Sequence, residues 1–228
     1  MGEEKWRVHQ TGSLANDSIK GIEFLTIEDI RKLFPAASKQ GYFLVTQHPE
    51  TMARAQVATQ INAVLTALKG YGLPVVFTYP NLDAANKTII KAVENFVGKN
   101  KNSLLIKNAG RQLYYSLVKH AAAVVGNSSS GIYDTPYLKI PAVNIGHRQD
   151  GRLKAANVID VGYDPAAIQR ALKKSASPAF HASLDHAIQG FFGRGDAASQ
   201  MVRVFEGLGL DKSLLIKKFV STGKSHRV

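Results

Sequence analysis

Short apolar runs and amphipathic stretches alternate along this chain. The runs at 42–47, 74–79, 103–108, 122–127, 141–146 and 157–161 are typical of buried strands. Apolar residues at helical spacing predict helices at 49–72, 83–100, 111–120, 164–174, 182–192 and 197–208, and a short helix at 129–138. Strands that alternate with helices indicate an α/β fold with a doubly wound parallel sheet, Rossmann-like, with helices on both faces.

The ends of the chain are less regular than its middle. Residues 6–10 predict a weak strand and residues 26–34 a helix, which Thr26 and Asp29 begin as a capping box. Pro49 suits the first position of the helix at 49–72, and Gly70 and Gly72 suit its end. We therefore expect a leading segment with linker character at 1–38, one Rossmann-like domain at 39–208, and a tail at 209–228.

Composition excludes several classes of protein. The 228 residues contain no cysteine, so disulfides and thiolate metal sites are ruled out. No run of about 18 apolar residues predicts a membrane span, and the charged start does not resemble a signal peptide. We expect a cytoplasmic protein without a membrane partner. The histidines show no metal-ligand spacing, so no metal is expected.

The net charge of +12 raises the question of an anionic partner. Lysine and arginine are spread along the whole chain, without zinc-finger spacing or aromatic-interleaved basic runs. This pattern argues against nucleic acid. A smaller anion, such as a nucleotide diphosphate, explains the excess equally well, because a positive field around a cleft speeds the capture of anionic ligands.

Two strand ends carry side chains suited to such an anion. His48 stands directly after the first strand, where it can donate to a phosphate or merely pack in the turn. After the second strand, Asn81 and Asp83 can cap the next helix, or Asn81 can turn its amide toward a ligand. Lys87 lies one turn later and faces either the ligand or solvent.

The segment VVGNSSSGIYDTP, at 124–136, follows the fourth strand. Gly126 lets the backbone turn sharply, and Asn127 and three serines then precede a helix. The serines are either a simple cap or, with the free N–H groups of the helix start, a phosphate site. Gly131 allows close approach of a ligand, and Asp134 can accept from two vicinal hydroxyls. The site we predict here contains Ser128, Ser129, Ser130, Gly131 and Asp134.

A basic loop follows the fifth strand. Arg148 and Arg152 can reach a pyrophosphate as forked donors, or they can lie in solvent. Gly146 and Gly151 shape this loop next to the serine segment, which favours the first interpretation.

Taken together, these segments resemble the hydrolysing UDP-N-acetylglucosamine 2-epimerases of the sialic and legionaminic acid pathways. VTQHPET, YPNLDAANK, VVGNSSSGIYDTP, PAVNIGHRQDGR and NVIDV occur in that family's order and spacing, and the resemblance runs from about Arg7 to Leu208. The segment FGRGDAASQMV resembles the family's YGDGxAS segment, with Arg194 at the position of an aspartate. Asp134 stands where the family more usually has glutamate.

The resemblance implies a fold and a set of roles. The family has two Rossmann-like domains in the glycosyltransferase-B arrangement, and this chain corresponds to the C-terminal half, which holds most of the UDP. His48 would approach the diphosphate and is the candidate catalytic residue. Asn81 would lie in the nucleotide site, Ser128 and Ser129 would bind phosphate, Asp134 would accept from the ribose, and Arg148 would line the cleft.

The resemblance also implies a reaction that needs no cofactor. The family eliminates UDP from UDP-N-acetylglucosamine to give a 2-acetamidoglucal, and water then adds to give N-acetylmannosamine. The carboxylates that move the protons lie mainly in the N-terminal domain. We therefore expect this chain to bind UDP or UDP-N-acetylglucosamine, to turn over nothing alone, and to associate with an N-terminal domain or with a second copy.

Three alternatives stay open at the level of sequence. The chain can be the donor-binding half of a glycosyltransferase of the same architecture. It can belong to the non-hydrolysing epimerases, which have a basic HRRE-like stretch where this chain has HPET. It can also be a non-enzymatic module that binds nucleic acid or another anion, in which case binding falls steeply with salt and shows no preference for uridine.

Overall fold

The sheet at the centre of the molecule has six parallel strands in the order β3-β2-β1-β4-β5-β6. This computed structural model describes residues 2–37, 41–188 and 190–221. The strands are β1 (Phe43–Thr46), β2 (Val75–Thr78), β3 (Ser103–Ile106), β4 (Ala123–Gly126), β5 (Ala142–Ile145) and β6 (Val158–Val161). All six predicted strands are confirmed, and their order is that of a Rossmann fold.

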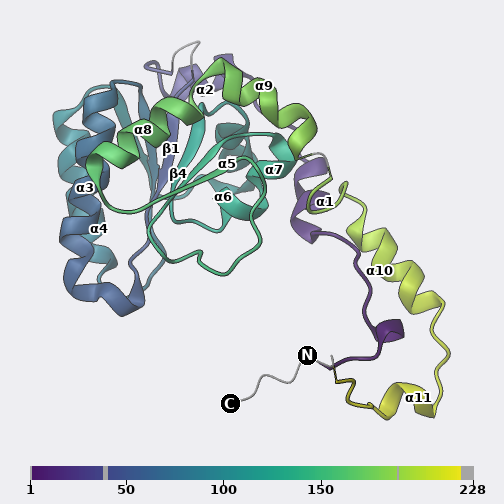
Figure 1. Ribbon diagram of the computed structural model, residues 1–228. Coiled ribbons are helices and arrows are strands. Elements are labelled where there is room, and N and C mark those ends of the chain that lie inside the picture. Colours follow the sequence, from purple (N-terminus) through teal and green to yellow (C-terminus); the bar gives the residue numbers. More distant parts are fainter. Residues whose placement is uncertain (1, 38–40, 189, 222–228) are drawn as a thin grey trace.

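Helices cover both faces of this sheet (Figure 1). The helices of the described residues are α1 (Leu14–Lys20), α2 (Ile27–Leu33), α3 (Val57–Tyr71), α4 (Asn86–Lys99), α5 (Gly110–Lys119), α6 (Ser130–Tyr133), α7 (Thr135–Leu138), α8 (Pro165–Ser175), α9 (Pro178–Ala187), α10 (Ala197–Glu206) and α11 (Lys212–Leu215). Two 3-10 helices, η1 (Lys5–Arg7) and η2 (Thr51–Gln56), complete the structure as far as it is described. None of the helices in this part of the chain is long and apolar enough to cross a bilayer.

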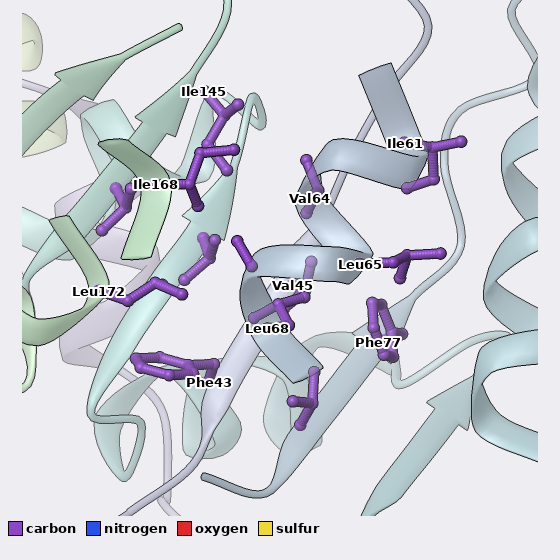
Figure 2. Close-up of a cluster of buried hydrophobic side chains, with 14 of the residues drawn as sticks. Phe43, Val45, Ile61, Val64, Leu65, Leu68, Phe77, Ile145, Ile168 and Leu172 are labelled. Atoms are coloured by element: carbon purple, nitrogen blue, oxygen red, sulfur yellow. The ribbon is translucent and has the colours of Figure 1, made fainter. Parts of the chain in front are cut away.

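The core lies in two layers because successive strand residues point to opposite faces. Phe43 and Val45 of β1 pack with side chains of α3, α4 and α8. Figure 2 shows this cluster, with Ile61, Val64 and Leu68 on α3 and Ile168 and Leu172 on α8. Leu44 points the other way, into a second cluster with α2 and α5. Burial on both faces explains why the central strands β1, β2 and β4 are apolar up to their last residue, whereas the edge strand β6 contains the exposed Asp160.

Several helices begin or end away from the predicted positions. The helix predicted at 49–72 starts as η2, has a non-helical Ala53, and becomes α3 only at Val57. The cause lies at Glu50, whose Oε1 accepts from the N–H of His147 (2.9 Å) and the hydroxyl of Tyr163 (2.7 Å). Glu50 is extended, and only the 3-10 helix η2 follows it before the α-helix begins. Gly72, with φ +88°, ends α3 as predicted, whereas Gly70 lies inside it.

Other boundaries were also wrong. The strand expected at 6–10 is absent, and Lys5–Arg7 forms η1. The short helix expected at 129–138 is split at Asp134 into α6 and α7. The helix expected at 182–192 runs over Pro178–Ala187, with Ser177 as its N-cap. At α2, both halves of the capping box between Thr26 and Asp29 are present, as predicted.

The first residues and the last helices form an arm that extends from the sheet (Figure 1). Asp17 of α1 caps α10, because its carboxylate accepts from the N–H groups of Ala197 (2.9 Å) and Ala198 (2.7 Å). Asn16 donates to the carbonyls of Phe192 (3.0 Å) and Gly193 (3.1 Å). The segment around FGRGDAASQ thus joins the arm to the domain. In the tail predicted at 209–228, Lys212–Leu215 forms α11, and residues 222–228 lie outside the described residues.

Candidate functional site

The carboxyl ends of β1, β2, β3 and β4 surround an open pocket of about 400 Å³. Its lining includes Thr46, His48, Thr78, Tyr79, Asn81, Ile106, Lys107, Asn108, Ala109, Gly110, Tyr114, Ser128, Ser129, Ser130 and Asp134. The structure therefore brings together the predicted residues after the first, second and fourth strands.

The centre of this pocket is the topological switch point of the sheet, where the winding direction of the chain reverses; it is called the winding switch below. β1 pairs with β2 on one side and with β4 on the other. His48 follows β1, and Ser128–Ser130 follow β4, so the two predicted phosphate-binding segments are neighbours here. In open α/β sheets, ligands bind at this position, outside the carboxyl ends of the strands.

Gly126 makes the close approach of these two segments possible. Its φ is +118°, and a Cβ at this position would lie 2.1 Å from the carbonyl oxygen of Thr46. A side chain would therefore collide with the main chain of β1. The predicted sharp turn is confirmed, and its physical reason is contact between two backbones.

His48 is held with one ring nitrogen directed at the protein. Its Nδ1 accepts from the main-chain N–H of Asn81 at 3.0 Å. Burial lowers the pKa of His48 to about 4, with a further lowering by the positive charge of Arg148 and an opposing effect of Asp83. The ring is therefore neutral at pH 7. Because Nδ1 accepts a hydrogen bond, the single ring proton is on Nε2.

The serine segment has donors that do not serve as a helix cap. Ser129 occupies the N-cap position of α6 but makes no side-chain cap, and Ser128 Oγ accepts from the N–H of Ser130 at 3.3 Å. No described residue accepts from the N–H groups of Ser128 and Ser129. Ser130 Oγ is also buried; it lies near enough to the Asp134 carboxylate to lower the pKa of that group, but makes no hydrogen bond of ordinary geometry in the described part of the chain. These groups can donate to an anion in the pocket.

Asp134 lies at the junction of α6 and α7, on the wall of the same pocket. Burial raises its pKa, and the nearby hydroxyls of Ser130 and Tyr115 oppose this effect. Tyr114 also lines the pocket, and burial raises its pKa to about 12, so it stays a neutral donor. Burial leaves the carboxylate of Asp134 poorly solvated, so hydrogen bonds from the hydroxyl groups of a ligand would stabilise it.

The loops after β2 and β3 form the outer wall of the pocket. Asn81 does not cap the next helix, and neither does Asp83, because α4 begins at Asn86 after an N-cap at Ala85 without a side-chain bond. Lys87 is exposed and does not line the pocket. Sequence reasoning missed the residues that follow β3, namely Lys107, Asn108, Ala109 and Gly110. The signal was their position directly after an apolar run of the sequence, the same signal that singled out His48.

Two predicted site residues do not reach the pocket. Gly131 is buried, and a Cβ there would face Ala142 at 3.6 Å and Val124 at 3.8 Å, so its small size serves packing of α6 on the sheet. Arg148 lies behind the serine segment, where its Nη1 donates to the carbonyl of Asn127 at 3.2 Å. Neither residue belongs to the pocket lining described above, so contact of Gly131 or Arg148 with a ligand stays a prediction.

The second basic residue of that loop is engaged elsewhere. Arg152 lies over the ring of Tyr133, 5.4 Å from its centroid, and is exposed. Within the described residues, no group of three or more histidines and carboxylates is arranged to hold a metal ion.

Comparison with known proteins identifies relatives of this chain. The profile of the family described as UDP-N-acetylglucosamine 2-epimerase matches residues 1–206. A GDP/UDP-N,N'-diacetylbacillosamine 2-epimerase (hydrolyzing) of Campylobacter jejuni is 38% identical over 162 residues, which cover 70% of this chain and 42% of that protein. The polysialic acid biosynthesis protein P7 of Escherichia coli is 28% identical over 221 residues, covering 96% of this chain and 56% of that protein.

Solved structures agree in fold. The UDP-GlcNAc 2-epimerase of Methanocaldococcus jannaschii, in complex with UDP-GlcNAc and UDP, has a TM-score of 0.67 at 18% identity, covering 90% of this chain and 56% of that one. The chain spans about half the length of the relatives it matches. Since the profile match extends over residues 1–206 of 228, the chain belongs to the UDP-N-acetylglucosamine 2-epimerase family, as its sequence motifs predicted.

Proposed function

We propose that this chain is the UDP-binding half of a hydrolysing UDP-N-acetylglucosamine 2-epimerase, and that the pocket at the ends of β1 to β4 holds the UDP. One observation carries the proposal: a neutral His48 with its proton on Nε2 lies beside three serines at the winding switch of a parallel sheet. The family membership and the hydrolysing relative from Campylobacter jejuni support the reaction class.

The hydrogen-bond donors of His48 and the three serines are suited to stabilise a diphosphate leaving group. When the bond between the sugar carbon C1 and the UDP oxygen breaks, negative charge grows on the terminal phosphate. Donors fixed in place beforehand stabilise that charge more than they stabilise the bound substrate. With a pKa of about 4, His48 acts here as a hydrogen-bond donor, because imidazolium is scarce at pH 7.

Asp134 suits the ribose of the same ligand. A carboxylate can accept from the two vicinal hydroxyls of a ribose, and such bonds favour its ionised form. The wild-type chain should therefore bind UDP roughly tenfold more tightly than 2'-deoxy-UDP, and Asp134→Ala should remove that preference. Equal affinities for the two nucleotides in the wild type would assign Asp134 to another role.

The isolated chain should bind nucleotide without converting the sugar. It spans about half the length of its relatives, and the resemblance assigns the proton-transfer carboxylates mainly to the other half. Incubation with UDP-N-acetylglucosamine should leave the substrate intact. Rapid release of N-acetylmannosamine by this chain alone would show that the carboxylates are present here.

Titration with UDP tests the binding proposal directly. The amide signals of Ser128–Ser130 should shift in NMR spectra, and UDP should bind more tightly than ADP. Ser129→Ala should weaken binding roughly tenfold, since a hydrogen bond to a charged group is lost. Ser183→Ala removes an exposed hydroxyl of α9 that donates to the carbonyl of Phe180, and should leave the affinity unchanged.

The same titration tests one of the alternatives. Short DNA that competes at low salt and is released at high salt, without a preference for uridine, would favour an anion-binding module. A donor-binding half of a glycosyltransferase would also bind UDP, but the family match favours the epimerase. Location in the cytoplasm, and pairing with a second copy or an N-terminal domain, remain predictions.

A further inference from the structure

Asn127 is a fully buried polar residue directly behind the pocket, with 0% of its surface exposed. Its side chain makes two hydrogen bonds to the main chain of His48. Oδ1 accepts from the N–H of His48 at 2.7 Å, and Nδ2 donates to the carbonyl of His48 at 2.9 Å. The amide thus pairs with one residue of the loop after β1 as a neighbouring strand would.

The main chain of Asn127 is held as firmly as its side chain. Its N–H donates to the carbonyl of Thr46 at 3.2 Å. Its carbonyl accepts from Gln149 Nε2 at 2.7 Å and from Arg148 Nη1 at 3.2 Å. Asn127 therefore connects the ends of β1 and β4 with the loop after β5, the three segments nearest the winding switch.

The ring of His48 is fixed at a second point, because Nδ1 accepts from the N–H of Asn81. The two hydrogen bonds from Asn127 to the main chain of His48 and the contact of the ring with Asn81 together set the direction of Nε2. Asn127 itself does not line the pocket, so any effect on a ligand passes through its neighbours.

We propose that Asn127 is a positioning residue, which fixes the main chain of His48 so that the ring keeps its contact with Asn81 and presents Nε2 to the ligand phosphate. The ligand part of this proposal rests on the proposed function; the positioning part does not. Asparagine is suited to the task because its amide both donates and accepts. Aspartate accepts only, and serine is too short to reach both groups of one peptide segment.

The test compares Asn127→Asp and Asn127→Ser with Asn157→Ala. Asn157 is a matched control, because it is also 0% exposed and donates to Thr135 Oγ1 and the carbonyl of Ile140, both at 2.8 Å. Two quantities are measured: the NMR shifts of the His48 ring nitrogens over a pH titration, and the dissociation constant for UDP. Unfolding by urea confirms that each variant is folded.

Both Asn127 variants should move the His48 ring signals, and Asn127→Asp should raise the pKa of His48 because it adds a carboxylate. UDP affinity should fall roughly tenfold, a loss typical of a displaced charge-assisted hydrogen bond. Asn157→Ala should lower stability while the His48 signals and UDP affinity stay unchanged. In a His48→Ala background, Asn127→Ser should cost little further affinity, because it adds no charge near the phosphate and the two residues act through one contact.

Unmoved His48 signals in folded Asn127 variants would overturn the proposal, whether or not UDP binds. An undiminished loss of affinity in the His48→Ala background would also overturn it, since Asn127 would then act on the ligand independently of His48. Failure of the wild-type chain to bind UDP would defeat the proposed function instead, while the shift of the His48 signals would still decide the positioning role.

Discussion

The two sides of the pocket differ in how firmly their residues are held. On the inner side, formed by Thr46, His48 and Ser128–Ser130, His48 is 6% exposed and is held from behind by Asn127, which is 0% exposed. On the outer side, formed by residues 79–81 and 107–110, Asn81, Lys107 and Asn108 are exposed. The inner side lies between two neighbouring central strands, whereas the outer side includes the end of β3, an edge strand.

Because of this difference, the two sides of the pocket are suited to different roles in ligand binding. A buried, hydrogen-bonded wall holds donors in place without reorganisation, which favours binding of a charged group in a fixed position. An exposed wall can adjust to the rest of a ligand at little cost. We therefore expect substitutions on the inner side to change stability and geometry, and those on the outer side to change mainly affinity, and only slightly.

The largest expected effect compares two glycines with positive φ, one from each side. Gly126→Ala should destabilise the chain by roughly 3 kcal/mol, because strain and a collision with Thr46 add together. Gly110 has φ +61° but open space around it, so Gly110→Ala should cost only about 1 kcal/mol. Urea unfolding measures both values. Equal losses would mean that the inner side is no more tightly packed than the outer.

The next effect concerns the pH dependence of stability. His48 has a pKa of about 4 when folded and about 6.5 when unfolded, so the unfolded chain binds the proton first as the pH falls. Stability should be fully present above pH 6.5 and should decline by about 3 kcal/mol as the pH falls to about 4, at about 1.4 kcal/mol for each pKa unit.

His48→Gln isolates this contribution. Glutamine does not titrate, so the free energy of unfolding of this variant should decline less between pH 6.5 and about 4 than that of the wild type. His147 is the control, because it is exposed and its pKa is raised by Asp150. His147→Gln should not reduce the decline. A His48→Gln curve parallel to that of the wild type would place His48 in a more solvated environment.

The smallest effect belongs to the outer side. Lys107→Ala should weaken UDP binding about twofold at low salt, and the difference should disappear at high salt, because exposed charges are screened. Lys101 precedes β3, at the amino end of the strand and therefore on the far side of the sheet from the pocket, and is also exposed. Lys101→Ala should leave the affinity unchanged. A large, salt-independent loss in Lys107→Ala would reveal a desolvated contact and would weaken the contrast between the two sides.

Sequence patterns predicted the parts of the site that depend on local order. His48 and Ser128–Ser130 stand directly after apolar runs, and the ends of parallel strands meet at one edge of a sheet. The roles of Gly131 and Arg148 could not be obtained in this way. A Cβ at Gly131 would face Ala142 of β5, and Arg148 donates a hydrogen bond to the carbonyl of Asn127. Both contacts join segments that follow or belong to different strands.

Helix boundaries failed for a similar reason. Helical spacing predicted a helix from Pro49, but bonds from Glu50 to His147 and Tyr163 delay it to Val57. The two partners lie about a hundred residues further along the chain, where no local pattern reveals them.

The sequence by itself determined the alternation of six strands with helices, the burial of the sheet on both faces and the polar residues at the strand ends, because side-chain periodicity is a local property. Tertiary structure alone decided the strand order, and with it the neighbours of each strand end. It placed the loop after β3 in the pocket, left Arg148 behind it, and brought Asn127 against His48, because contacts between distant segments depend on how the whole sheet packs.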